Sequence, residues 1–420
     1  MDSSQLAGRI RGVLGGAGRQ APDSGLPTSG ARSPEPEALD LSALGGEWRD
    51  GCFLVERRFE PAVPYGRERV GDLSARLEQA AHRTALVGAP LAVPPFVFLD
   101  LETTGLSGGA GTQAFLVGLG AFTSDGAFLT RQFLLTRIAD ERRILGRVAE
   151  ILSAAGALVT FNGRSFDAPV LETRYLYHRL EWVAGRLPHL DALHPARRFW
   201  GADSDACTLV SLERKILGAR RVGDVPGFEI PARYFQFLRT RDAAPLAGVF
   251  EHNRLDLLSL AGVAARLLHL VDAGPSGVRH PREALALGRI YERAGLNERA
   301  HEALERSTAL CGCADIEVRL ESLRWRAILL RRERRFDDAA ACWRAIVDTH
   351  GCPAARAREA NEALAIHHEH RVRDLQAARS YALETLKSGG PAVHRAVAHR
   401  VARLDKKMRH PLLGAGEAVG

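Results

Sequence analysis

The chain has 420 residues, of which 46% are hydrophobic and 25% are charged. This length predicts two or three domains with sizeable cores, and no apolar run approaches the ~20 residues of a membrane span. The formal net charge of +7 permits attraction to a polyanion, but 57 basic and 50 acidic residues mostly predict a mixed, solvated surface.

The N-terminal part of the chain divides by composition near residue 45. Residues 1–45 are rich in Gly, Pro, Ser and Ala without sustained periodicity, which favours a disordered arm with one short helix near residues 6–14. Residues 46–94 are interpreted as an extension. Within it, the strand-like segment 53–59 is expected to add an edge strand to the following sheet, and a helix is expected near 73–85.

Two acids lie at the end of the next apolar strand, predicted over residues 96–101. Asp100 and Glu102 are two residues apart, so in extended backbone they point to the same face. Two carboxylates this close repel unless a cation lies between them, and oxygen donors suit magnesium or manganese. The alternative is a strand that merely ends in two exposed acids. The glycine-rich stretch 105–111 that follows lacks a phosphate-loop ending and is predicted to be a mobile loop.

The following pattern predicts a hairpin and then a helix–strand unit. Strands are expected over 115–123 and 128–135 around the turn 124–126, and Asp140 can cap a helix that runs to about residue 155. A buried strand over 157–161 then leads through a turn to a helix that begins near Ser165. Asp167 is placed in the first turn of that helix, where the simpler role is to complement the helix dipole.

A further acid is predicted on a later helix. Apolar residues recur at helical spacing over 249–260, and His252 and Asp256 lie one turn apart on the same face. An isolated pair of this kind is more often a plain i,i+4 contact.

Together these residues resemble the three ordered motifs of the DEDD exonuclease superfamily, the DnaQ-like nucleases on a ribonuclease H-like fold. The segments that carry the resemblance are Asp100 to Leu106, Asn162 to Asp167 and His252 to Asp256. The likeness is greatest to a bacterial branch of YprB-like proteins, and it extends through His189-Leu190-Asp191 and Asp224 to Pro231. It covers residues 95–275 and implies an α/β ribonuclease H-like domain in which three antiparallel strands precede alternating helix and strand.

The resemblance implies a two-metal phosphodiesterase that acts from the 3′ end. Two divalent ions, Mg²⁺ or Mn²⁺, would be held by Asp100, Glu102, Asp167 and Asp256, to activate water and to stabilise the leaving oxygen. His252 would act as the general base. The substrate-facing residues would be Thr103, Thr104, Leu106, Asn162 and Phe166, with core packing as the alternative for Leu106 and Phe166.

His252 departs from the family pattern. In members with a histidine base, that residue precedes the last Asp by five positions, whereas His252 precedes Asp256 by four, the spacing of the tyrosine-type members. One residue rotates a helical side chain by about 100°, so the role of His252 as the base is left open.

The C-terminal third is predicted to be helical, as residues 278–405, followed by a flexible tail over 406–420. Ala300, Ala339 and Ala377 recur at intervals of about 38 residues, and small residues at such positions resemble a tetratricopeptide repeat, whose usual period is ~34. A plain helical bundle is the alternative. This region is expected to bind a protein partner or nucleic acid.

Six cysteines in a chain without a secretory signal favour reduced thiols and a cytoplasmic location. The sequence thus predicts a metal-dependent nuclease, most simply a 3′–5′ exonuclease, that acts on single-stranded DNA or RNA ends and has no membrane partner. The alternatives are a catalytically weak nucleic-acid-binding protein and a scaffold that acts through its helical repeats. A two-metal site acts on phosphate, so the sequence does not separate RNA from DNA.

Overall fold

The computed structural model describes residues 39–80, 92–105, 111–201, 207–388 and 391–409. Most of the expected arm over 1–45 lies outside these ranges, as do Leu106, most of the glycine-rich stretch and the tail from residue 410.

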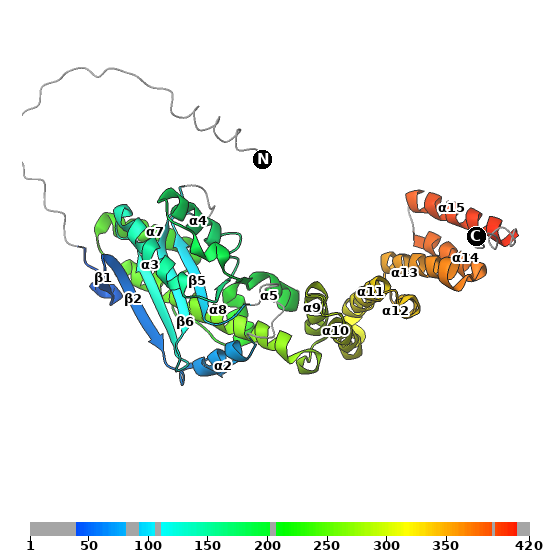
Figure 1. Ribbon diagram of the computed structural model, residues 1–420, viewed down its shortest axis with the longest axis horizontal. Coiled ribbons are helices and arrows are strands. Elements are labelled where there is room, and N and C mark those ends of the chain that lie inside the picture. The colour runs from blue at the N-terminus through cyan, green and yellow to red at the C-terminus, as the bar shows by residue number, and fades with distance from the viewer. Residues whose placement is uncertain (1–38, 81–91, 106–110, 202–206, 389–390, 410–420) are drawn as a thin grey trace, which may run out of the picture. The chain divides into compact units, whose positions relative to one another are not determined.

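A seven-stranded sheet forms the centre of the α/β region (Figure 1). Its strand order is β1-β2-β7-β6-β5-β8-β9. Strands β5, β6 and β7 pair antiparallel, β8 runs parallel to β5, and β9 runs parallel to β8. Three antiparallel strands followed by alternating helix and strand confirm the predicted fold class. The strand bounds are β1 Glu47–Arg49, β2 Cys52–Phe59, β5 Phe96–Thr103, β6 Ala114–Phe122, β7 Phe128–Leu134, β8 Ala157–Thr160 and β9 His189–Asp191.

The segment expected to add an edge strand does join the sheet, but not at its edge. Strand β2 pairs with β7 along its length, from Phe53 opposite Leu134 to Phe59 opposite Phe128. Strand β1 pairs with the other side of β2 and is the outermost strand. Residues 40–45 also differ from the predicted arm, because Leu41 and Leu44 are buried and Asp40 bridges Asp242.

Two turn predictions have different outcomes. Gly126 has φ +82° and donates its amide to the carbonyl of Thr123, as a tight hairpin turn requires. Asp140 lies just before helix α3, but its carboxylate makes no capping hydrogen bond. That part of the prediction is wrong, because Arg137 and Arg143 bind the carboxylate instead.

Helix α8 is the longest helix of the α/β region and packs against strands β5 to β8. Its sequence is apolar on most sides, so residues such as Leu257, Leu258 and Leu267 are fully buried. The helices of this region are α2 Val70–Ala80, α3 Glu141–Ser153, α4 Asp167–Tyr177, α5 Leu193–Trp200, α6 Leu209–Leu212, α7 Ile230–Thr240 and α8 Ala247–Ala273; the short strands β3 Pro64–Tyr65 and β4 Glu68–Arg69 form a separate hairpin.

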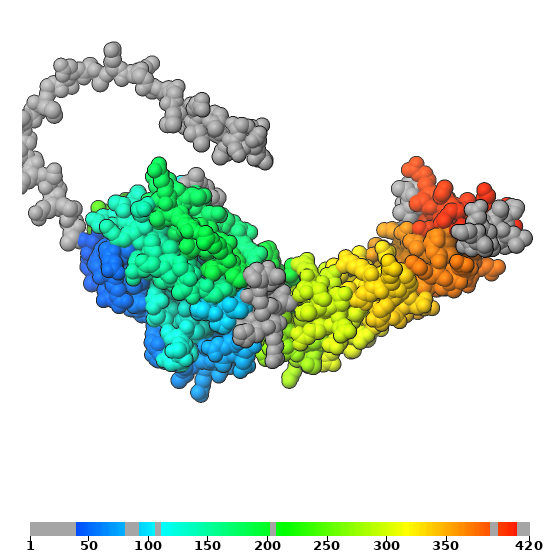
Figure 2. Space-filling view, in the orientation of Figure 1, coloured from blue at the N-terminus to red at the C-terminus, as the bar shows by residue number. Residues whose placement is uncertain are grey.

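The C-terminal region is helical, as predicted, and each helix packs on the next (Figure 1). Figure 2 shows the surface of these residues, coloured from yellow-green to red in chain order. Helices α9 and α10 approach closely, since a Cβ added at Gly288 would lie 2.7 Å from Leu304 Cγ. Their apolar faces continue the core that α8 begins, through Leu287, Ile290 and Ala303. The helix bounds are α9 Pro281–Arg293, α10 Asn297–Leu310, α11 Ile316–Arg332, α12 Phe336–Val347, α13 Ala354–His367, α14 Leu375–Glu384 and α15 Pro391–Arg409. Among the described residues, no helix combines the length and apolar character needed to cross a membrane.

Candidate active site

The two acids of the first motif lie at the carboxyl end of β5. Asp100 and Glu102 are half-buried, while Leu101 between them is buried on the opposite side of the strand, as the alternation of a strand requires. The pairing of β5 with β6 shifts register between Glu102 and Thr103. This irregularity follows both carboxylates directly, at the point where β5 ends.

Asp167 reaches the same rim from the neighbouring strand. The chain leaves β8, turns at Asn162 with φ +69°, and enters α4, where Asp167 is buried in the first turn as predicted. The carboxylate of Asp191, from the end of β9, accepts the backbone amides of Asn162 and Arg164 at 2.8 and 3.1 Å. Asp191 therefore holds the turn that positions Asp167.

Helix α8 brings His252 and Asp256 to the site from the face that covers β5. The Nδ1 atom of His252 lies 2.7 Å from Oδ1 of Asp224, and its Nε2 atom lies 3.4 Å from Oδ2 of Asp256. A carboxylate only accepts hydrogen bonds, so Nδ1 of His252 donates to Asp224. The i,i+4 spacing thus places the imidazole between two carboxylates with Nε2 toward Asp256.

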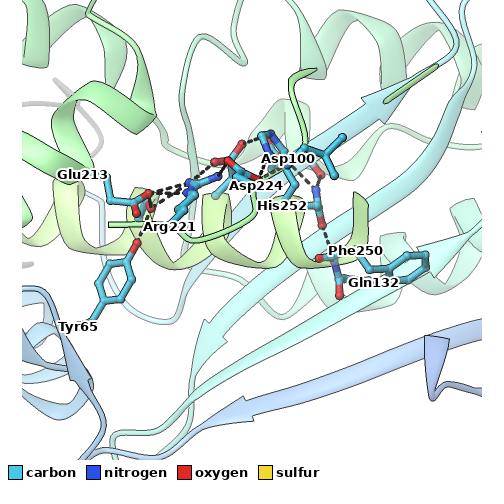
Figure 3. A network of polar contacts seen from close by, with 12 residues as sticks. Tyr65, Asp100, Gln132, Glu213, Arg221, Asp224, Phe250 and His252 are labelled. Carbon is cyan, nitrogen blue, oxygen red and sulfur yellow. Dashed lines mark hydrogen bonds and ion pairs between the residues drawn. The ribbon is translucent and has the colours of Figure 1, made fainter. Parts of the chain in front are cut away.

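Arg221 is a buried cation that links Asp224 and Asp256 to a further acid, Glu213 (Figure 3). Its side chain is 4% exposed and contacts Asp256 at 2.5 Å, Glu213 at 2.7 Å and Asp224 at 3.2 Å. Glu213 also accepts from Ser259 at 2.6 Å, and the Ser259 hydroxyl lies 2.5 Å from that of Tyr65. One guanidinium therefore fixes both Asp256 and the carboxylate that orients His252.

Asp100 is held by a separate chain of amides. Asn253, fully buried on α8, donates from Nδ2 to Oδ2 of Asp100 at 2.7 Å. Gln132 on β7 donates to Oδ1 of Asn253 at 2.9 Å, which fixes which way the Asn253 amide faces. Gly118 is the residue of β6 opposite Asp100, and it leaves space for the Asn253 side chain. A Cβ at this position would lie 2.2 Å from Oδ1 of Asn253.

The four predicted acids lie within electrostatic reach of one another. Burial and the charges of Asp256, Glu102 and Asp167 raise the pKa of Asp100 well above its ordinary value. Burial, followed by the charges of Asp256 and Asp167, also raises the pKa of Glu102 well above its ordinary value. Burial raises the pKa of Asp167 to about 7, although backbone amides partly offset it. Burial also raises the pKa of Asp256, against the opposing effect of Arg221.

The donor set fits divalent cations. Arg221 neutralises the Asp256 side, whereas Asp100, Glu102 and Asp167 face one another's charge with no cationic side chain paired to any of them in the described part of the chain. Within the same residues, no group of three or more His, Cys, Asp and Glu side chains is arranged to hold a metal ion. The fit therefore rests on the excess negative charge and on the oxygen donors.

The residues predicted to face substrate differ in their contacts and in their exposure. The Thr103 hydroxyl donates to the carbonyl of Gly105, and that of Thr104 accepts the amide of Gln113, so both tie down the ends of the glycine-rich stretch. Asn162 is exposed, and Phe166 is half-buried immediately before α4. Leu106 lies outside the described residues.

Sequence reasoning missed the residues that support the acids. Asp224, Asp191 and Asn253 all occur in segments quoted for the resemblance, but nothing in their spacing indicated a role. Arg221 and Gln132 carry no sequence signal, because they reach the site only when the chain between residue 213 and α8 folds over and when β7 pairs with β6.

Comparisons with known proteins agree with the fold. Residues 97–268 match the model of the RNase_H superfamily, so the sheet and the helices that carry the four acids form a ribonuclease H-like domain. The chain is also 31% identical over 252 residues to the uncharacterized protein YprB of Bacillus subtilis (strain 168). That similarity covers 59% of this chain and 58% of the relative's length. Ribonuclease H-like nucleases generally use divalent metals.

Proposed function

We propose that the ribonuclease H-like domain is a divalent-metal-dependent nuclease of the DEDD type that removes nucleotides from the 3′ end of a single strand. The convergence of four acids from β5, α4 and α8 carries this proposal. The three that have no cationic partner within the described residues, Asp100, Glu102 and Asp167, all have raised pKa values. Such a site favours bound cations over free carboxylates.

The side chains have distinct parts in the proposed reaction. Asp100, Glu102, Asp167 and Asp256 would hold two Mg²⁺ or Mn²⁺ ions, which when bound supply activation of water and stabilisation of the leaving oxygen. The Nε2 atom of His252 accepts a proton from the attacking water.

The contacts of His252 suit this proton transfer. Because Nδ1 is bonded to Asp224, a protonated His252 would have a carboxylate against each ring nitrogen. Arg221 keeps both of those carboxylates in place.

The loop residues at the rim are proposed to position the substrate. Asn162 and Phe166 would contact the terminal nucleotide, together with Thr103, Thr104 and Leu106 around the glycine-rich stretch. The helical region from α9 onward would bring a partner or a longer nucleic acid to the domain.

Degradation of end-labelled single-stranded DNA and RNA tests the proposal. We expect the wild-type protein to shorten strands from the 3′ end in Mn²⁺ or Mg²⁺ and to be inactive in EDTA. Asp100→Asn should be inactive in all conditions. Asp125→Asn is the matched control, because Asp125 lies in the β6–β7 turn at the other end of the sheet and should leave cleavage unchanged. Metal-independent cleavage, or full activity of Asp100→Asn, would contradict the proposal.

A further inference from the structure

The C-terminal helices contain a hollow that no part of the proposed nuclease site lines. It lies between the end of α11, helices α12 and α13, and the π-helical turn His368–Val372, and its volume is about 520 Å³. This is within the ~300–1,000 Å³ range of binding pockets. Phe336, Trp343, Ile366 and three alanines form its apolar surface. We call it the α12–α13 groove.

The rim of the groove is basic. Arg331 and Arg371 lie on it together with His367 and His370. No carboxylate within the described ranges forms an ion pair with either guanidinium; Arg371 instead lies over the ring of Phe336, 3.7 Å from its centroid. Two acids contact the histidines of the rim. Asp337 is 3.5 Å from His367 with its side chain 94% exposed, and Glu369 is 3.7 Å from His370 but is paired with Arg403 and Lys407. Two arginine charges are therefore left for an acidic ligand.

The apolar surface suits an aliphatic side chain better than a nucleic-acid base. Single-stranded nucleic acids bind by stacking bases on open aromatic faces. Here Arg371 covers the face of Phe336, and Trp343 is only 7% exposed. Ile366, in contrast, is 40% exposed beside the alanines. A branched aliphatic side chain can fill this space without uncovering an aromatic ring.

We propose that the α12–α13 groove binds an acidic peptide segment of a partner protein. One Leu- or Ile-sized side chain inserts beside Ile366, and carboxylates on either side of it pair with Arg331 and Arg371. The apolar insertion supplies most of the affinity, and the charge complementarity supplies orientation and a faster encounter. This interaction is independent of the proposed nuclease activity.

Fluorescence anisotropy with the full-length protein tests the groove. The probe is a labelled peptide with one leucine flanked on each side by three glutamates. We expect saturable binding that weakens as salt is added, because exposed charge pairs are screened. Arg331→Glu and Arg371→Glu should each weaken binding roughly tenfold or more. Ile366→Asp should do the same, and thermal unfolding monitors whether that variant folds.

The matched control is Arg319→Glu, an exposed arginine near the start of α11 and away from the groove. It carries the same charge reversal and should bind the peptide as the wild type does. Equal binding of a peptide in which glycine replaces the leucine would overturn the proposal, as would unchanged affinity in both groove arginine variants. Competition by a single-stranded oligonucleotide that the same two variants abolish would also overturn it, in favour of nucleic acid.

Discussion

Arg221 shows how single residues set the charge of the proposed site. Its guanidinium neutralises Glu213 and Asp256 in a buried position, and the surrounding carboxylates raise its own pKa. Asp100, Glu102 and Asp167 keep no such partner within the described residues. The negative charge left for cations is therefore concentrated at β5 and the start of α4, while the α8 side is largely balanced before any cation binds.

His252 is the residue whose role the spacing left open. If Nε2 accepts the proton of the attacking water, His252→Ala should lower turnover by about 10²- to 10⁴-fold without changing the metal requirement. Titration of Mn²⁺ against cleavage rate measures both effects. If high Mn²⁺ restores the rate, His252 only orients Asp256. A wild-type rate in His252→Ala would remove the residue from the mechanism.

The hydrogen bond from Asn253 to Asp100 can be tested by a substitution at Gly118. Gly118→Ala places a Cβ where Asn253 now lies, so the Asn253–Asp100 hydrogen bond should break and the protein should lose about 1–3 kcal/mol of unfolding free energy. Chemical denaturation measures the loss. Gly146→Ala is the control, because nothing lies within 4 Å of a Cβ at that helical position and the change should be neutral or stabilising. Equal stability of the two variants would show that Asn253 has room to move.

At the scale of elements, the strand pair β8–β9 supports the turn that carries Asp167. His189 of β9 lies with Nε2 2.8 Å from the hydroxyl of Thr160 on β8. Burial, followed by the charge of Arg164, lowers the pKa of His189 to about 4. The folded protein therefore holds the ring neutral under conditions in which the unfolded chain binds a proton.

The pH dependence of stability follows from that shift. Because the folded pKa of His189 is lower than the unfolded one, its contribution is fully present above about pH 6.5 and is lost as pH falls toward 4, by about 3 kcal/mol. His189→Gln should flatten this part of the profile in urea unfolding measured from pH 7 to 4. The exposed His194→Gln should keep the wild-type slope. An unchanged slope in His189→Gln would place the acid sensitivity elsewhere.

Local patterns predicted the elements but not how they support the site. The alternation in β5 and the helical spacing in α8 were enough to place Asp100, Glu102 and Asp256, since each depends only on its own segment. The supporting contacts join segments that are far apart in the sequence. Asn253 meets Asp100 only because β6 has a glycine opposite Asp100, and Arg221 meets Asp256 only after an irregular segment with a π-helical turn over Glu213–Leu217. No local period encodes either contact.

At the scale of the whole molecule, the apolar core does not stop at the predicted boundary near residue 278. Leu287, Ile290 and Tyr291 of α9 share one core with α8, and the Tyr291 hydroxyl donates to the carbonyl of Val271 at 2.5 Å. Trp200 of α5 likewise donates to Glu283 at 3.2 Å. The first helical hairpin thus covers apolar surface of the α/β region.

This continuity predicts how the chain tolerates truncation. A protein that ends at residue 277 should unfold at lower temperature than one that ends at residue 312, with a loss of at least about 3 kcal/mol, because removal of α9 and α10 exposes several large apolar side chains. Circular dichroism melting compares the two. Equal melting temperatures would mean that the α/β region is stable without the hairpin.

The most direct test of the central claim is the cleavage rate of four single variants, Asp100→Asn, Glu102→Gln, Asp167→Asn and Asp256→Asn, on a 3′-labelled single strand in Mn²⁺. Each swap keeps the size of the side chain and removes its charge, so the fold should survive while cation binding fails. We predict that all four lose cleavage while their circular dichroism spectra match the wild type, with Asp125→Asn fully active. Robust cleavage by any two of the four would contradict a shared two-metal site.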